Sequence, residues 1–220
     1  MKSDLIMIKC CIFDLDGVLV DTAKYHYLAW KSVAHEMGFD FTEQDNERLK
    51  GVSRMASLDI LLSIGGVTLT DDEKRQVADR KNSRYLEYIL KMTPDEVLPG
   101  VIDFLNELKK RSVKIALGSA SKNALTILRQ TGIEHFFDAI ADGNNVTHAK
   151  PDPEVFLTAA SLAGTAPAES LVFEDAVAGI EAAHRAGIRA VGVGDANILT
   201  EADYHIRGFL EKEMLLQLLN

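Results

Sequence analysis

The sequence predicts an α/β protein, a doubly wound parallel sheet whose first strand is followed by an all-helical insertion. Two observations support this fold class. From residue 97 onward, short apolar runs alternate with helical patterns, as is typical of parallel strands joined by crossover helices. Between 22 and 90 only helical patterns occur, and they lie between one early strand and that alternation.

The first strand is expected at 8–13, where the run IKCCIF is rich in β-forming residues and ends at an acidic turn containing glycine. In the insertion, apolar residues recur every three or four positions from Tyr27 to Met37, and Gly38 follows as a helix stop. A longer helix is expected after Thr70, which forms a capping-box pattern with Glu73. Two shorter helices are expected, one starting near Thr42 with Asp45 and one over 56–64.

After the insertion, the alternating pattern assigns the remaining elements. Further strands are expected at 113–117, 139–141, 171–173 and 190–193. Helices are expected at 101–111, 123–131, 153–163 and 176–186. The chain is thus divided into a Rossmann-like core of 1–21 and 91–220 and a helical cap of 22–90, with helices packed on both faces of the sheet.

Composition excludes several classes of protein. The net charge of −9 disfavours a nucleic-acid surface, which needs clustered Lys and Arg, but permits a small anionic substrate. Cys10 and Cys11 are adjacent, and a disulfide between neighbours in a strand would be strained, so both are expected to be reduced and buried. The short apolar stretch near the start is broken by Lys9, so no membrane span is expected there. The protein is expected to be a cytoplasmic monomer.

Polar side chains follow the predicted strands at the point where each ends. In open α/β sheets, ligands bind beyond the carboxyl ends of the strands, so these side chains are expected to converge. They are Asp14 and Asp16 after the first strand, Ser119 with Ala120, Ser121, Lys122 and Asn123 after the second, Lys150 after the third, and Glu174 with Asp175 after the fourth.

Each group has a chemical use at such a site. Asp14 and Asp16 lie two apart, so their carboxylates share a face, and one can attack phosphorus while the other handles the proton. The gathered carboxylates predict one magnesium ion, which prefers oxygen ligands. Ser119 and the amides opening the next helix predict an anion cradle, and Lys150 offsets the charge of phosphate and nucleophile.

Other interpretations stay open for single residues. An Asp-x-Asp turn after a strand is common without function, and Lys150 before a proline is often a solvated loop residue. Ser121 and Asn123 are also typical capping residues. The functional interpretation depends on all the groups falling at strand ends of one sheet.

Four motifs resemble those of the haloacid dehalogenase superfamily: FDLDGV at 13–18, Ser119, Lys150 and the pair Glu174-Asp175. The resemblance covers essentially the whole chain, including the position of the cap. It implies that Asp14 becomes an aspartyl phosphate and that Asp16 is the general acid and base. It also implies Mg²⁺ held by the Asp14 carboxylate, the Asp16 backbone carbonyl and Asp175, with Glu174 among or beside the ligands.

Further stretches resemble the β-phosphoglucomutase family: DTAKYH at 21–26, LKGVSR at 49–54, RKN at 80–82 and ALGSASKN at 116–123. This resemblance implies conversion of β-glucose 1-phosphate to glucose 6-phosphate through bound β-glucose 1,6-bisphosphate. In the cap, it implies that Arg54 clamps the phosphate not being transferred, that Gly51, Val52 and Ser53 touch the sugar, and that His26 and Lys81 couple cap closure to Asp16. In the core, Ser121, Lys122 and Asn123 would complete the distal contacts, with Ala120 beside them.

Within the cap, His26 could equally be a packing residue and Lys81 a solvated one, whereas 51–54 reads as an exposed loop between helices. Gly118 stands where the family would have Ala, and it is expected to loosen the strand end slightly. A sugar-phosphate phosphatase is the main alternative function, because it uses the same aspartyl phosphate. A binding protein without catalysis is a third, which the full set of polar groups disfavours.

Overall fold

The structure, a computed structural model, describes residues 7–49 and 52–219. Over these residues six parallel strands form one sheet in the order β3-β2-β1-β4-β5-β6. The strands are β1 (Cys10–Phe13), β2 (Lys114–Gly118), β3 (Ala139–Ala141), β4 (Ser170–Glu174), β5 (Arg189–Val193) and β6 (Tyr204–Ile206). The predicted doubly wound α/β fold is confirmed. The order reverses at β1, which lies between β2 and β4 at the centre of the sheet.

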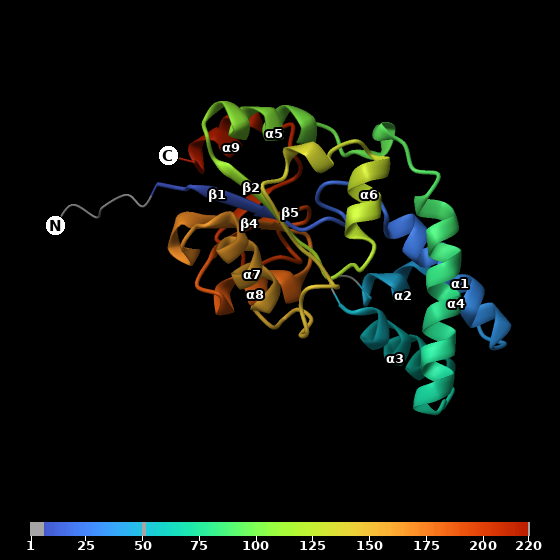
Figure 1. Ribbon diagram of the computed structural model, residues 1–220. Helices are drawn as coiled ribbons and strands as arrows, with labels where there is room; N and C mark the ends of the chain where they lie inside the picture. The colour runs from blue at the N-terminus through green and yellow to red at the C-terminus, as the bar shows by residue number, and fades with distance from the viewer. Residues whose placement is uncertain (1–6, 50–51, 220) are drawn as a thin grey trace.

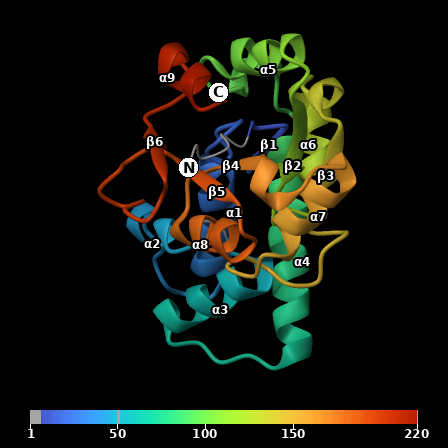
Figure 2. The same cartoon turned by 90° about the vertical axis from the view of Figure 1, so that its left-hand side faces the viewer.

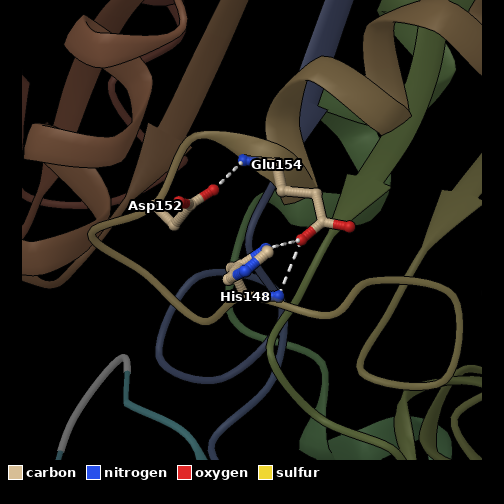
Figure 3. Close-up of side chains that lie close together, drawn as sticks. All are labelled: His148, Asp152 and Glu154. Atoms are coloured by element: carbon tan, nitrogen blue, oxygen red, sulfur yellow. Dashed lines mark hydrogen bonds and ion pairs between the residues drawn. The ribbon is translucent and has the colours of Figure 1, made fainter.

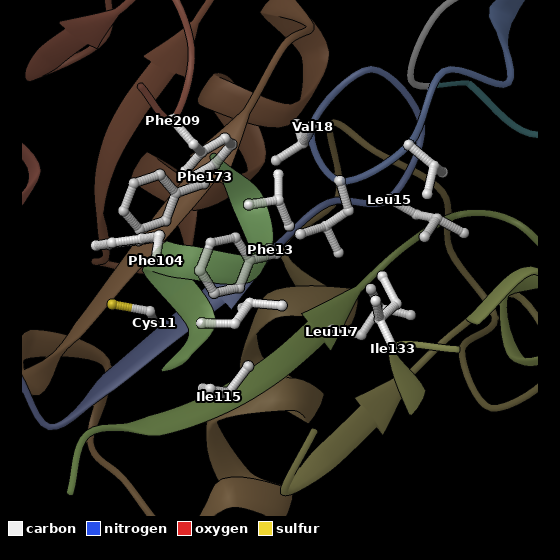
Figure 4. Close-up of a cluster of buried hydrophobic side chains, with 14 of the residues drawn as sticks. Cys11, Phe13, Leu15, Val18, Phe104, Ile115, Leu117, Ile133, Phe173 and Phe209 are labelled. Atoms are coloured by element: carbon white, nitrogen blue, oxygen red, sulfur yellow. The ribbon is translucent and has the colours of Figure 1, made fainter. Parts of the chain in front are cut away.

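Helices cover both faces of the sheet (Figures 1 and 2). One face packs against α5 (Val101–Lys110), α6 (Ala124–Gln130) and α9 (Lys212–Gln217), and the other against α7 (Glu154–Ala163) and α8 (Val177–Arg185). On the first face, the rings of Phe13 and Phe173 stack with centroids 4.8 Å apart, and Phe104 and Phe209 surround them (Figure 4). Strands buried on both sides explain why the central runs of the sequence are continuously apolar.

Between β1 and α5 lies a helical segment whose helices pack mainly on one another. It contains α1 (Ala23–Glu36), α2 (Glu43–Glu47), α3 (Arg54–Gly65) and α4 (Asp71–Ile89), which we call the cap (Figure 1). Trp30, Phe41, Leu58, Leu61 and Val77 form its own buried cluster. The capping box of α4 is present, since the hydroxyl of Thr70 accepts from the Glu73 amide and the Glu73 carboxylate accepts from the Thr70 amide.

Two connecting segments join the cap to the core, and backbone hydrogen bonds link them to each other. Val20 bridges Val97 in antiparallel fashion, and the amide of Leu98 donates to the carbonyl of Leu19 at 2.9 Å. These segments follow β1 and precede α5. Paired in this way, they fix the point about which the cap meets the carboxyl edge of the sheet.

The observed elements differ from the expected ones in three respects. The sequence patterns did not reveal β6 or α9. The helix expected at 56–64 begins earlier, at Arg54, because the Ser53 hydroxyl accepts from the Ala56 amide and caps the helix. Arg54 is therefore a helical residue rather than part of an exposed loop.

Candidate active site

The centre of the site is a buried lysine between two carboxylates. Asp14 follows β1 directly, and its amide donates to the carbonyl of Phe173 on the neighbouring β4 at 2.9 Å. Lys150 is 4% exposed, and its Nζ donates to Asp14 Oδ1 at 2.5 Å and to Glu174 Oε2 at 2.8 Å. The alternative of a solvated loop lysine is wrong.

Burial and the neighbouring charges shift the pKa values of Lys150 and Glu174. Burial by itself would lower the pKa of Lys150, but the carboxylates of Asp14 and Glu174 outweigh it and raise that pKa, so the ammonium stays charged. Burial together with the charges of Asp14 and Asp175 raises the pKa of Glu174, against the opposing effect of Lys150. One ammonium thus faces more negative charge than it can balance.

Asp175 completes an acidic cluster that fits a metal ion. Ligand oxygens of Asp14, Glu174 and Asp175 all lie within 4.8 Å of one another. Gly17 makes room for the Asp175 carboxylate, because a Cβ at this position, where φ is +82°, would collide with it. An excess of carboxylate oxygens in one place suits a hard divalent cation such as Mg²⁺.

Asp16 lies beside this cluster and is hydrogen-bonded to a residue at the start of the cap. It is half-buried, and Thr22, the residue that precedes α1, donates its hydroxyl to Asp16 Oδ1. Burial and the nearby charge of Asp14 raise the pKa of Asp16 to about 6. Such a carboxyl is suited to giving and taking a proton near neutral pH.

The turn after β2 carries the predicted anion-binding residues. Ser119 is buried, and its hydroxyl accepts from the Ser121 amide at 3.1 Å, while the Ser121 hydroxyl accepts from the Asn123 amide at 3.2 Å. Both serine hydroxyls thus organise the turn. Ala120 lies between them, and Lys122 is exposed to solvent.

In the cap, Lys81 and His26 are joined. Lys81 is 3% exposed, and its Nζ lies 2.9 Å from His26 Nδ1 and 4.5 Å and 4.9 Å from the ring centres of Tyr85 and Trp30. Burial and the neighbouring Arg54 lower the pKa of Lys81 to about 7, and burial and Lys81 lower that of His26 well below its usual range. His26 Nδ1 therefore accepts from Lys81, and the imidazole is neutral with its proton on Nε2.

Arg54 meets the core through a residue to which sequence reasoning gave no role. Arg54 Nη2 donates to Asn82 Oδ1 at 2.8 Å, and Asn123 Nδ2 donates to the same oxygen at 2.9 Å. Although Asn123 precedes α6, its side chain points to the cap instead of capping the helix. The sequence signal that could have identified Asn82 is its position directly after Lys81, a predicted site residue. Val52 and Ser53 are half-buried next to Arg54, and Gly51 lies outside the described residues.

A second group of ligating atoms lies on the loop that carries Lys150. His148, Asp152 and Glu154 offer atoms within 4.8 Å of one another (Figure 3). The Glu154 carboxylate already accepts from the amides of Thr147 and His148, and the Glu154 amide donates to Asp152. These bonds hold the loop to the start of α7.

The fold and the site together define an α/β enzyme with a carboxylate–lysine centre at the carboxyl edge of a parallel sheet and a helical cap beside it. Residues 8–187 match the family model described as haloacid dehalogenase-like hydrolase, and the chain belongs to this family. The family resemblance inferred from the four motifs is confirmed.

Within this family, the chain is similar to phosphomutases and phosphatases that act on sugar phosphates. The chain is 46% identical over 201 residues to a β-phosphoglucomutase of Bacillus subtilis, covering 90% of this chain and 89% of the relative. It is 32% identical over 198 residues to a phosphorylated carbohydrates phosphatase of Thermotoga maritima, covering 87% and 89%. A crystal structure of β-phosphoglucomutase from Clostridium difficile superimposes with a TM-score of 0.91 at 41% identity, covering 96% of each chain.

Over the described residues, none of the helices combines the length and hydropathy that a membrane span requires.

Proposed function

We propose that this enzyme is a β-phosphoglucomutase, which interconverts β-D-glucose 1-phosphate and β-D-glucose 6-phosphate. In this proposal, 22–90 closes as a cap over the core formed by 1–21 and 91–220. The enzyme acts as a cytoplasmic monomer. The 46% identity to the Bacillus subtilis β-phosphoglucomutase supports the assignment.

Asp14 is the proposed nucleophile and carries the phosphoryl group as an aspartyl phosphate. The 2.5 Å contact with Lys150 holds the Asp14 carboxylate in place. When β-glucose 1-phosphate binds, its 6-hydroxyl attacks the phosphorus, the bond to Asp14 breaks, and Asp16 takes the hydroxyl proton. The product is β-glucose 1,6-bisphosphate, with Asp14 free again.

In the second half of the cycle, the bisphosphate presents its other end to Asp14. The Asp14 carboxylate attacks the phosphorus at C1, and Asp16 returns its proton to the leaving sugar oxygen. This releases glucose 6-phosphate and restores the aspartyl phosphate. An Asp16 pKa of about 6 suits both directions of this proton transfer.

Asp14, Asp175 and the backbone carbonyl of Asp16 are the proposed ligands of one Mg²⁺ ion, with Glu174 among or beside them. When bound, the ion would neutralise charge on the phosphoryl oxygens. Ser119 and Lys150 are proposed to bind those same oxygens from the core side.

The observation that carries the mutase assignment is the position of Arg54. A mutase must hold one phosphate at Asp14 while a second phosphate occupies the far end of the site. Arg54 of the cap points, through Asn82, to Asn123 of the core, beside Ser121 and Lys122. A guanidinium next to these donors suits a phosphate that is bound and not transferred. Val52 and Ser53, with Gly51, are proposed to touch the sugar.

A coupled assay tests the proposal. β-Glucose 1-phosphate with Mg²⁺ and a trace of β-glucose 1,6-bisphosphate should give glucose 6-phosphate, read through glucose-6-phosphate dehydrogenase. Asp14→Asn should lose turnover at least about 10³-fold, because the nucleophile is gone. The exposed Asp103→Asn is the matched control and should keep it. Release of inorganic phosphate in place of glucose 6-phosphate would overturn the mutase and favour the phosphatase alternative.

A further inference from the structure

One oxygen atom joins the cap to the core. Asn82 lies on α4, and its Oδ1 accepts from Arg54 Nη2 at 2.8 Å and from Asn123 Nδ2 at 2.9 Å. Arg54 opens α3 in the cap, whereas Asn123 precedes α6 in the core. Helices α4 and α6 are in contact, so this oxygen lies where the cap rests on the core (Figures 1 and 2).

The two donors that converge on Asn82 are of the type that binds phosphate. A phosphate oxygen accepts readily from a guanidinium and from a side-chain amide. Asn82 Oδ1 therefore fills, in this structure, the acceptor position that a phosphate oxygen would take. The long, flexible Arg54 side chain is already held in one orientation by this bond.

Charge determines whether Asn82 or a phosphate accepts the hydrogen bonds of Arg54 and Asn123. The Asn82 amide oxygen is neutral, and a hydrogen bond to an anion is roughly twice as strong as one to a neutral acceptor. A phosphate dianion therefore takes both donors from Asn82, whereas an aspartate at this position would compete with it.

We propose that Asn82 is a positioning residue, which holds Arg54 and Asn123 ready for the phosphate that is not transferred and yields both donors to it on binding. The proposal rests on the proposed function, because it assumes a second phosphate in the site. It explains how the cap reaches the core before substrate is present and how the substrate's far phosphate then completes the closure.

Two substitutions separate positioning from packing. Asn82→Ala removes the shared acceptor, and KM for β-glucose 1-phosphate should rise about tenfold with kcat falling less than twofold. The two donors are then no longer oriented before the substrate binds, and this cost falls equally on the bound ground state and the transition state. Asn82→Asp keeps an oxygen in place but adds charge, and KM should rise further than in Asn82→Ala. Asn106→Ala, an exposed asparagine on α5, is the matched control and should keep the wild-type KM.

A double-mutant cycle tests whether Asn82 acts through Arg54. In an Arg54→Ala background, Asn82→Ala should change KM by less than threefold, because the guanidinium that it positions is absent. A full tenfold effect in that background, or an unchanged KM in Asn82→Ala alone, would overturn the proposal. So would a smaller KM in Asn82→Asp than in Asn82→Ala.

A single-phosphate donor checks that the variants are intact. Acetyl phosphate has no second phosphate, so it should phosphorylate Asp14 in Asn82→Ala within twofold of the wild-type rate. If the wild-type enzyme makes no glucose 6-phosphate, the proposed function has failed by itself. The same KM comparison is then made on phosphate release from β-glucose 1,6-bisphosphate, where an unchanged KM in Asn82→Ala contradicts the positioning role.

Discussion

Lys150 and Lys81 are both buried, yet their surroundings move the two pKa values in opposite directions. Lys150 contacts two carboxylates, which raise its pKa despite burial. Lys81 is held by the neutral His26 and by the faces of Trp30 and Tyr85, and burial with the charge of Arg54 lowers its pKa to about 7. The same side chain is thus a fixed charge in the core and a titratable group in the cap.

Lys81 makes stability depend on pH in a defined direction. Its pKa is 10.5 unfolded and about 7 folded, so between these values the unfolded chain binds more protons and stability rises with pH. At about 1.4 kcal/mol per pKa unit, the gain reaches a few kcal/mol, reduced by the attraction of the aromatic rings for the ammonium. Lys81→Met lacks this group, so the free energy of unfolding of the wild type relative to Lys81→Met should increase from pH 7 to pH 10.

Urea unfolding at several pH values measures this difference, and the exposed Lys110→Met controls for the substitution itself. A wild-type advantage over Lys81→Met that shrinks with rising pH would contradict the prediction.

The burial of Lys81 could have been anticipated from the sequence. The buried residues of α4 are Val77, Ala78, Lys81, Tyr85 and Ile89, which follow one helical stripe. A lysine on such a stripe is unusual, and the apolar neighbours four residues to either side were the signal. Its partner His26 and the bridging oxygen of Asn82 could not be found in this way, because they depend on how helices pack across the cap and the core.

At the scale of elements, the sequence predicted the central strands better than the edge. Strands β1 and β4 are buried on both faces and therefore read as continuous apolar runs. Edge strand β6 has the sequence YHI with two half-exposed residues, so no apolar pattern marks it. The start of α3 was missed by two residues because Ser53 caps it without the acidic partner that revealed α4.

Gly118 has a packing reason that the sequence did not reveal. It ends β2, and a Cβ at this position would lie 2.7 Å from the ring of Phe156 on α7. That ring in turn lies 4.7 Å from Lys150 Nζ. Gly118 is therefore expected to serve packing and not to loosen the strand end. Its missing side chain leaves room for the Phe156 ring, which contacts the Lys150 ammonium.

Gly118→Ala should therefore destabilise the protein, although Ala usually favours ordered structure. Displacing Phe156 overpacks the face of the sheet and is expected to cost about 1–3 kcal/mol in urea unfolding. Gly208→Ala is the matched control, since a Cβ there meets nothing within 4 Å, and its effect should stay within about 0.5 kcal/mol. Equal stabilities for the two variants would show that the Phe156 ring yields without cost.

For the whole molecule, the sheet order brings together charges that the chain keeps far apart. Asp14 follows β1, Glu174 ends the neighbouring β4 and Asp175 follows it, while Lys150 lies on the loop after β3. The sequence placed each group at a strand end, and the doubly wound topology predicted their convergence. The surplus of negative charge predicts that a divalent cation bound at the cluster stabilises the native state.

Magnesium should therefore stabilise the folded protein. At a concentration one hundredfold above Kd, binding to the native state alone adds about 2.7 kcal/mol. For a chain of this size that corresponds to a rise in Tm of roughly 5–10 °C. Thermal unfolding with EDTA and then with excess MgCl₂ measures the shift, and EDTA should also abolish turnover.

Two variants assign the shift to one cluster. Asp175→Asn removes a ligand from the site at Asp14, and its magnesium shift should fall below about 2 °C, because the site loses charge as well as an oxygen. Glu154→Gln alters the partly exposed group that Glu154 forms with His148 and Asp152. The Glu154 carboxylate already accepts from backbone amides, so this variant should keep the full shift. If Glu154→Gln lost the shift and Asp175→Asn kept it, the metal would belong to the loop before α7, and the carboxylates around Asp14 would be balanced by Lys150 alone.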